Sequence, residues 1–239
     1  MIIAIGDVHG KFDQLILKIQ NVLMGNSGVN FVQLGDFGLG FGHPKNEWSK
    51  LDELNQILLD SDSKLYVIRG NHDNPALWYK GIRFEFSNIQ FVIDDTLLLI
   101  EDKYCYFAGG AISVDRSNRR QGVDYWSDEG YASLEWVFGG HVNGEFDRID
   151  FLFTHDVYHP CSPYSISNSH IVNHFAKVDK RLIPRLMESQ EEMKILYYDI
   201  VKISPNFTWY HGHYHESHVT NNYEQITHSL SELEFKEVR

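Results

Sequence analysis

The chain has 239 residues, a formal net charge of −12 and an apolar fraction of 43%. This length suits one large domain or two small ones, and we expect a single domain over residues 1–239. The acidic balance disfavours a sequence-blind binder of duplex nucleic acid, which needs a broad basic face. No stretch is long enough and apolar enough to span a bilayer, so no membrane partner is expected.

We expect no secretory signal, because Met1 leads straight into an apolar, strand-like run without a basic segment or a cleavage site. Cys105 and Cys161 are the only two cysteines. They do not resemble a disulfide framework, which favours a protein of the reducing cytoplasm. The oligomeric state does not follow from the sequence.

The first third of the chain alternates apolar runs with amphipathic stretches. Runs at 2–5, 31–34 and 65–68 are typical of buried strands. Between them, apolar residues recur at helical spacing over 12–23 and again over 48–58. The order strand, helix, strand, helix, strand predicts parallel pairing with right-handed crossovers.

The rest of the chain has a different pattern. Three short apolar runs over 89–108, separated by acidic turns, predict an antiparallel meander. Ser127-Asp128-Glu129 resembles a helix start, and Pro184 is expected to divide the helical stretch 171–203 into two helices. Late strands are expected from about 207 to 238, and with the meander they would form a second sheet.

Five apolar runs end directly before side chains that can bind metals. Open α/β sheets place their ligand sites just beyond the carboxyl ends of strands, so five such ends imply one shared site. The candidate ligands are Asp7, His9, Asp36, Asn71, His155, His213 and His215. Each of these residues alone is more often a turn or surface group. The agreement of five segments, each following a strand, is what supports a metal site.

The ligand types indicate the chemistry. Imidazole and carboxylate suit borderline divalent ions, and we expect manganese, with iron, zinc, cobalt or nickel as alternatives. Seven ligands exceed what one ion usually takes from a protein, so two ions are expected, with Asp36 the best candidate to bridge them. Two ions about 3.5–4 Å apart are used for in-line displacement at phosphorus. His72 could protonate the departing alkoxide.

The five segments together resemble the motif series of the calcineurin-like metallophosphoesterase superfamily, and the loop from Gly109 to Arg116 resembles a segment of its bacterial and phage-type members. The resemblance is carried by Gly6-Asp7-Val8-His9, Gly35-Asp36, Gly70-Asn71-His72-Asp73, His155 and Gly212-His213-Tyr214-His215. It implies an α/β fold that is a four-layer α/β/β/α sandwich with two mixed β-sheets. It also implies His72 as the catalytic histidine. The first ion would be held by Asp7, His9, Asp36 and His215, and the second by Asp36, Asn71, His155 and His213.

One segment departs from the protein phosphatases of that superfamily, which continue Gly-Asp with Val-Asp-Arg-Gly. Here Gly35-Asp36 continues with Phe37-Gly38, so a phosphate-binding arginine is missing and a protein serine/threonine phosphatase is disfavoured. Arg69 matches the phosphatase-like pattern and is one candidate for binding the substrate. Arg116 is the other, ahead of its neighbours Arg119 and Arg120, with a solvated loop charge as the alternative interpretation.

The sequence therefore predicts a dinuclear-metal-dependent phosphoesterase that hydrolyses a phosphoester through a metal-bridging hydroxide. A phosphodiesterase or nuclease acting on nucleotides or single-stranded nucleic acid is the alternative. A non-catalytic binding scaffold is a third hypothesis, and the complete ligand set together with His72 disfavours it. The sequence does not decide between monoester and diester substrates.

Overall fold

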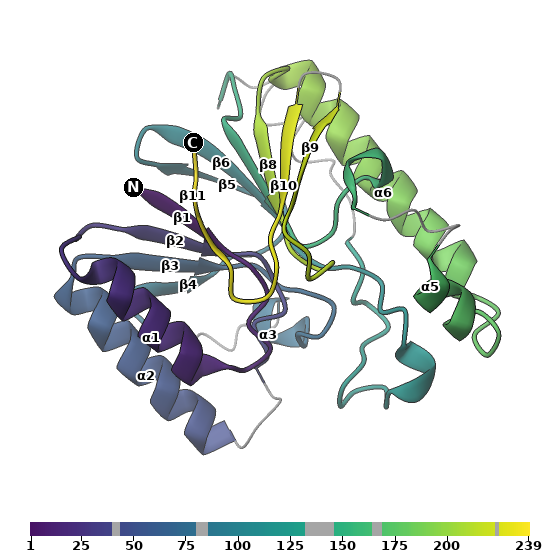
Figure 1. Ribbon diagram of the computed structural model, residues 1–239, viewed down its shortest axis with the longest axis horizontal. Helices are drawn as coiled ribbons and strands as arrows, with labels where there is room; N and C mark the ends of the chain where they lie inside the picture. The colour runs from purple at the N-terminus through teal and green to yellow at the C-terminus, as the bar shows by residue number, and fades with distance from the viewer. Residues whose placement is uncertain (40–43, 80–85, 132–145, 164–168, 223–224) are drawn as a thin grey trace.

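Two β-sheets lie face to face, with helices on both outer faces (Figure 1). This arrangement comes from a computed structural model, which describes residues 1–39, 44–79, 86–131, 146–163, 169–222 and 225–239. It confirms the predicted α/β/β/α sandwich with two mixed sheets.

The first sheet has the strand order β11-β1-β2-β3-β4. Its strands are β1 (Ile2–Ile5), β2 (Asn30–Gln33), β3 (Lys64–Val67), β4 (Ile89–Phe91) and β11 (Phe235–Glu237). Strands β1 to β4 pair in parallel, and β11 is antiparallel to β1. The crossovers between the first three strands are α1 (Phe12–Leu23) and α2 (Pro44–Asp60), as the sequence predicts.

The second sheet has the strand order β5-β6-β7-β8-β10-β9. Its strands are β5 (Thr96–Ile100), β6 (Lys103–Ala108), β7 (Phe151–Thr154), β8 (Thr208–His211), β9 (His218–Asn222) and β10 (Gln225–Ser229). The four central strands are parallel neighbours, while β5 and β9 run antiparallel at the two edges.

The predicted meander over 89–108 is wrong at its first strand. Strand β4 pairs in parallel with β3 in the first sheet, and only β5 and β6 form an antiparallel pair. The last strand, β11, also joins the first sheet and not the second. A short apolar run can add to any available strand edge, so its composition alone does not specify the partner.

Among the described residues, the remaining helices are short apart from one. They are α3 (Ala76–Tyr79), α5 (His170–Phe175), α6 (Leu182–Ile203) and the 3₁₀ turns η1 (Arg116–Asn118) and η2 (His159–Cys161). Pro184 lies in the first turn of α6, where no intrahelical N–H bond is lost. The stretch does contain two helices, but the break between them lies at residues 176–181, before this proline. The helix expected from Ser127 does not begin there, because residues 127–128 form a turn and 129–131 are irregular chain, and its remainder lies outside the described residues.

Three apolar layers hold the sandwich together. In β1, Ile3 and Ile5 pack with α1 and α2, whereas Ile2 and Ala4 pack in the layer between the sheets. In β7, Leu152 packs in the third layer, against α6. Alternate residues of a strand point to opposite faces, so strands buried on both faces are apolar throughout.

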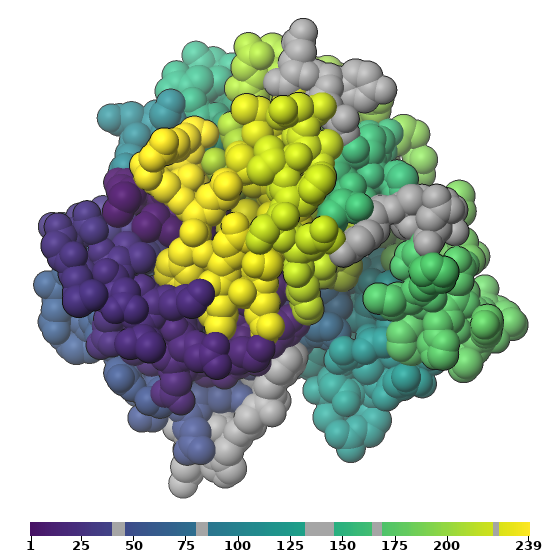
Figure 2. Space-filling model, viewed as in Figure 1, coloured from purple at the N-terminus to yellow at the C-terminus, as the bar shows by residue number. Residues whose placement is uncertain are grey.

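The C-terminal segment returns to the first ligand loop. Figure 2 shows these residues, in yellow, against the purple N-terminal ones. The backbone N–H of Leu233 donates to the Asp7 carbonyl at 2.9 Å, and Gly6 N–H donates to the Glu234 carbonyl at 3.0 Å. The loop after β1 is therefore fixed by chain from the other end of the sequence. Among the helices of the described residues, none has the length and hydropathy to cross a bilayer.

Candidate metal centre

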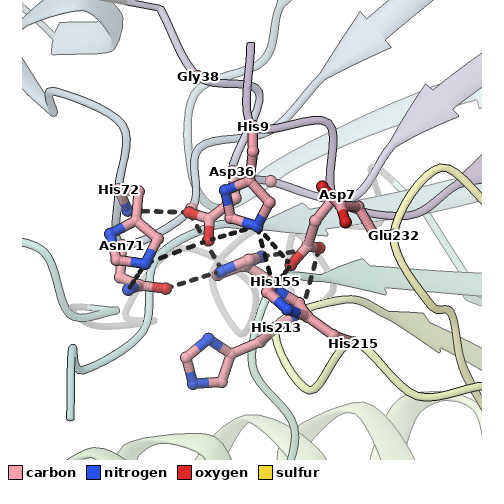
Figure 3. Close-up of polar contacts among 12 residues, drawn as sticks. Asp7, His9, Asp36, Gly38, Asn71, His72, His155, His213, His215 and Glu232 are labelled. Atoms are coloured by element: carbon pink, nitrogen blue, oxygen red, sulfur yellow. Dashed lines mark hydrogen bonds and ion pairs between the residues drawn. The ribbon is translucent and has the colours of Figure 1, made fainter. Parts of the chain in front are cut away.

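The carboxyl ends of five parallel strands, three from the first sheet and two from the second, meet at one place (Figure 3). Asp7, Asp36 and Asn71 follow β1, β2 and β3, while His155 and His213 follow β7 and β8. The two sheets face each other with these ends on the same side. The topology therefore brings together residues that are up to about two hundred positions apart in the sequence.

One part of the cluster has the spacing of a metal site. Asp7, His9, Asp36 and His215 each offer a ligand atom, and these atoms all lie within 4.8 Å of one another. Nε2 of His215 lies 2.9 Å from Oδ2 of Asp7 and 2.9 Å from Nε2 of His9. Across the described ranges, this is the one group of three or more His, Cys, Asp or Glu residues with that spacing.

The donor set of this group fits a divalent cation. Asp7 is fully buried and Asp36 is 1% exposed, so two carboxylates lie out of contact with bulk water. Oδ2 of Asp7 accepts no hydrogen bond of good geometry from the described residues. Buried carboxylates are costly unless they are paired or bind a metal. Two carboxylates and two imidazoles are ligands that suit borderline divalent ions.

The second group of predicted ligands lies beside the first. Nε2 of His155 is 2.9 Å from Oδ1 of Asn71 and 3.5 Å from Oδ1 of Asp36. Nδ1 of His155 donates to the Leu34 carbonyl at 2.7 Å, which orients the ring and directs Nε2 toward Asp36. The His213 ring stands apart in Figure 3, with its centroid 5.0 Å from that of His155. The structure thus brings six of the seven predicted ligands into one cluster, and the His213 ring lies beside it, next to His155.

The charges in the site are strongly coupled. Burial would lower the pKa of His155, but the carboxylates of Asp36 and Asp7 raise it to about 10. Burial would raise the pKa of Asp36, but His155, His72 and His9 together hold it well below its usual range. The cluster therefore keeps the carboxylate of Asp36 ionised.

His72 lies at the edge of the cluster. Its backbone N–H donates to Oδ1 of Asp36 at 2.8 Å, and its ring Nε2 lies 3.8 Å from Oδ2 of the same residue. Nη2 of Arg119 lies 3.3 Å from the same Nε2. Burial, with a contribution from Arg119, lowers the pKa of His72 to about 4 despite the carboxylate of Asp36.

Four of the eight predicted metal-binding and catalytic residues have a backbone conformation that L-residues rarely adopt. His9, Asp36, His213 and His215 have φ angles of 49°, 51°, 69° and 53°. Such a conformation costs on the order of 1–3 kcal/mol for a non-glycine residue and is found most often at functional sites. The strain concentrated in this cluster is a second indication that the loops are shaped for a ligand.

Two of the motif glycines have a clear steric reason. A Cβ on Gly70 would lie 2.1 Å from Oδ1 of Asp36 and 2.2 Å from its backbone nitrogen. A Cβ on Gly35, whose φ is +91°, would lie 2.5 Å from Nδ1 of His155. Any side chain at these two positions would push ligands apart.

Asp73 closes the Gly70-Asn71-His72-Asp73 motif and is not among the predicted site residues. Its buried carboxylate accepts N–H bonds from Phe37, Gly38 and Gly70 at 3.0, 2.8 and 2.8 Å. Burial and the nearby charge of Asp36 raise its pKa to about 6 against these bonds. Asp73 ties the loop after β3 to the loop after β2.

Arg69 does not have the surroundings of a substrate-binding residue. It is 2% exposed, and its Nη2 lies 2.7 Å from Oδ2 of Asp94. The same guanidinium donates to the carbonyls of Glu129 and Gly130, each at 2.8 Å. Its donors are therefore engaged inside the protein, which disfavours a direct contact between Arg69 and the substrate.

Arg116 and Arg119 line an open cavity of about 440 Å³, together with Gln121, Tyr125 and Asp179. Arg116 is held by the Asp179 carboxylate, with Nη2 at 2.8 Å from Oδ1. Arg119 is held by Asp115 and also reaches His72. Of the two arginines, the one that touches the predicted catalytic histidine is Arg119, which ranked behind Arg116 in the sequence analysis.

The family model for calcineurin-like phosphoesterases matches residues 1–217 of the chain. The chain belongs to the calcineurin-like phosphoesterase family. A comparison with curated proteins returns no match. Membership indicates a metal-dependent hydrolase of phosphoesters, and the carboxylate and imidazole cluster of this family member can hold a metal ion.

Proposed function

We propose that this protein is a single-domain phosphoesterase that uses two divalent ions and has His72 as its catalytic residue. The observation that carries the proposal is the closely spaced group of Asp7, His9, Asp36 and His215, with Asn71 and His155 directly beside it at the carboxyl ends of the strands. One ion would be held by Asp7, His9, Asp36 and His215, and the other by Asp36, Asn71, His155 and His213.

The position of Asp36 supports a bridging role. Its Oδ2 lies 3.9 Å from Nε2 of His9, and its Oδ1 lies 3.5 Å from Nε2 of His155. The two oxygens thus face one histidine from each ligand group. When bound, the ions would supply a hydroxide nucleophile near neutral pH and would neutralise charge on the phosphoryl oxygens.

The position of His72 supports a role at the leaving group. It lies beside Asp36 but outside the closely spaced group of four ligands, with Arg119 on its ring nitrogen. The negative charge of a phosphoester would favour the protonated imidazole and attract the guanidinium of Arg119. His72 could then donate its Nε2 proton to the departing oxygen, while Arg119 donates hydrogen bonds to the phosphoryl group.

A phosphodiesterase acting on nucleotides or single-stranded nucleic acid is the second candidate. The cavity beside Arg119 supports it, because its volume of about 440 Å³ offers room for a leaving group larger than a simple alcohol. The net charge of −12 argues against broad, nonspecific binding of nucleic acid.

Manganese is the proposed ion. The cytoplasm is the proposed location, and the buried free thiols of Cys105 and Cys161 are compatible with it.

Metal analysis and a paired assay test the proposal. The purified protein is loaded with Mn²⁺, desalted and measured for bound metal, then assayed with p-nitrophenyl phosphate and bis-p-nitrophenyl phosphate. We expect two ions per chain and turnover of at least one ester, with faster turnover of the diester if the second candidate is correct. Asp36→Asn should lose both metal and activity. Wild-type protein that binds no metal and hydrolyses neither ester would refute the proposal and leave the scaffold hypothesis.

A further inference from the structure

The side-chain amide of Asn71 has two chemically different ends of nearly equal size. Only Oδ1 can bind a cation, because the NH₂ group is a donor. Oδ1 lies 2.9 Å from Nε2 of His155, and Nδ2 donates to Oγ of Ser113 at 2.9 Å. A half-turn of the amide would exchange the two ends and place a donor in the metal site. The proper orientation therefore has to be specified by the groups around the amide.

Two groups contact the NH₂ end: Nε2 of His72 at 3.3 Å and, more closely, Oγ of Ser113, whose own hydrogen bonds are fixed by Glu129. The Ser113 hydroxyl donates to Oε2 of Glu129 at 2.6 Å, and the Ser113 backbone N–H donates to Oε1 at 3.0 Å. Glu129 is fully buried and Ser113 is 2% exposed. From α6, Arg185 donates to Oε1 of Glu129 at 3.2 Å.

These bonds have a direction. Burial raises the pKa of Glu129 to about 7, whereas the hydrogen bonds from Ser113 and Arg185 stabilise its ionised form. The ionised carboxylate only accepts hydrogen bonds, so in that form the single proton of the Ser113 hydroxyl points to Glu129. The remaining lone pairs of Oγ can only accept, and the group of Asn71 that can donate to them is Nδ2. The amide oxygen is then left on the side of His155 and Asp36.

We propose that Glu129, acting through Ser113, is a positioning residue that holds Oδ1 of Asn71 toward the metal site. The inference rests on the proposed role of Asn71 as a metal ligand. Neither Ser113 nor Glu129 belongs to the ligand motifs, and both lie in the chain that follows β6. Groups that orient a metal ligand without touching the ion commonly change metal affinity by about 10–100-fold.

The first test measures metal affinity in Ser113→Ala. Metal-free protein is titrated with Mn²⁺ in a calorimeter, and the two binding steps are fitted separately. One of the two binding steps should weaken by about 10–100-fold. We expect it to be the step with the lower affinity, and it is identified as the step that Asn71→Ala also weakens. The other step should change little, and the melting temperature of the metal-free protein should fall by about 2–10 °C because Oε2 of Glu129 loses a buried donor. Ser189→Ala is the matched control: it removes the buried hydroxyl of a different serine, which lies in α6, and it should bind both ions normally.

The outcomes separate this inference from the proposed function. Two ions bound by wild type with unchanged affinities in Ser113→Ala would overturn the positioning role alone. One ion bound by wild type, with no effect of Asn71→Ala, would overturn the two-ion site and the positioning role together.

A double-variant cycle tests the direction of the hydrogen bonds that join Glu129, Ser113 and Asn71. If Glu129 were merely structural, the result would not depend on this direction. Asn71→Asp places a carboxylate against Ser113, whose proton is already engaged by Glu129. Glu129→Gln supplies an NH₂ group that can donate to Oγ and so release the hydroxyl proton for the carboxylate. We expect Glu129→Gln to weaken Mn²⁺ binding when residue 71 is Asn and to strengthen it in the Asn71→Asp background. Independent, additive effects on the affinity would contradict the proposal.

Discussion

His72 is joined to Asp36 through its backbone and not through its ring. The His72 N–H donates to Oδ1 of Asp36 at 2.8 Å, whereas ring Nε2 remains 3.8 Å from Oδ2. The imidazole can therefore be removed while the contact that orients the predicted bridging carboxylate is retained. This separation makes the proposed catalytic role of His72 testable without disturbing the ligand cluster.

His72→Ala should retain wild-type metal content and lose about 10²–10⁴-fold in turnover, the usual contribution of a general acid. Metal analysis and steady-state kinetics on the same sample check both statements. His174→Ala, at an exposed histidine of α5, is the matched control and should leave both values unchanged. A variant of His72 that is fully metallated and as fast as wild type would remove the residue from the mechanism.

Asp73→Ala should destabilise the metal-free protein. Three buried N–H groups, of Phe37, Gly38 and Gly70, would lose their acceptor. An unsatisfied buried donor costs about 1–3 kcal/mol, and partial access of water to the gap reduces the sum, so we expect a loss of about 2–4 kcal/mol. For a chain of this size the melting temperature should fall by about 5–15 °C.

Thermal unfolding followed by circular dichroism in the presence of a chelator measures this change. Asp13→Ala, which removes an exposed carboxylate from the first turn of α1, is the control. A melting temperature within a degree or two of wild type would show that the three N–H groups find other partners.

The ligand set could be predicted from the sequence because each motif is local to one strand end. A buried strand followed by Asp, Asn or His can be recognised from a few residues. Because parallel strands share one direction, their carboxyl ends bring these side chains to the same edge of the sheet. The surroundings of Arg69 could not be predicted in this way. Its partners Asp94 and Glu129 lie 25 and 60 residues away, and nothing near Arg69 in the sequence indicates them.

Strand pairing and the residues that orient the ligands also depend on long-range contacts, which the local sequence does not specify. The pairing of β4 with β3 depends on which strand edge is available in the folded protein, and the apolar run 89–93 does not indicate its partner strand. Glu129 reaches Asn71 only through Ser113, so its role depends on three segments that meet in space. Local chemistry was visible in the sequence, and long-range contacts were not.

Arg69→Met should lower stability and leave substrate binding unchanged. The substitution leaves Asp94 buried without its cation, and breaking a buried ion pair in this way costs about 3–5 kcal/mol. We expect a clear fall in melting temperature, with KM of the folded fraction equal to that of wild type. An increase in KM at unchanged stability would restore Arg69 as a substrate-binding residue.

Arg119→Ala should have the opposite profile. Its guanidinium contacts Asp115 and His72 in a partly exposed position, so stability should change by less than about 1 kcal/mol. Loss of a charge-assisted bond to phosphate should raise KM by about 10-fold and weaken inhibition by inorganic phosphate to the same extent. Arg119→Lys should recover part of the loss. Equal KM values for wild type and Arg119→Ala would exclude the arginine from the substrate site.

The carboxylate of Asp95 gives a pH dependence that can be isolated from the metal centre. Tyr106 and Tyr131 donate to its Oδ1 at 2.8 and 2.6 Å, at the turn between β4 and β5. Burial nevertheless raises the pKa of Asp95 to about 6. Because this value lies above that of the unfolded chain, about 3.9, the folded state binds the proton more tightly. The stability that the protonated form contributes is complete below pH 4 and is lost as the pH rises through 6.

Asp95→Asn removes this dependence, since the amide stays neutral and asparagine tolerates the φ of +62° found at this position. The melting temperature of the variant minus that of wild type should therefore increase between pH 4 and pH 7. After allowance for solvent screening we expect a gain of about 1 kcal/mol, or about 2–4 °C. Taking the difference between two metal-free proteins cancels the titration of every other group, including the ligands. A difference that stays constant or shrinks over this range would mean that the two tyrosine hydroxyl groups stabilise the carboxylate more than burial destabilises it.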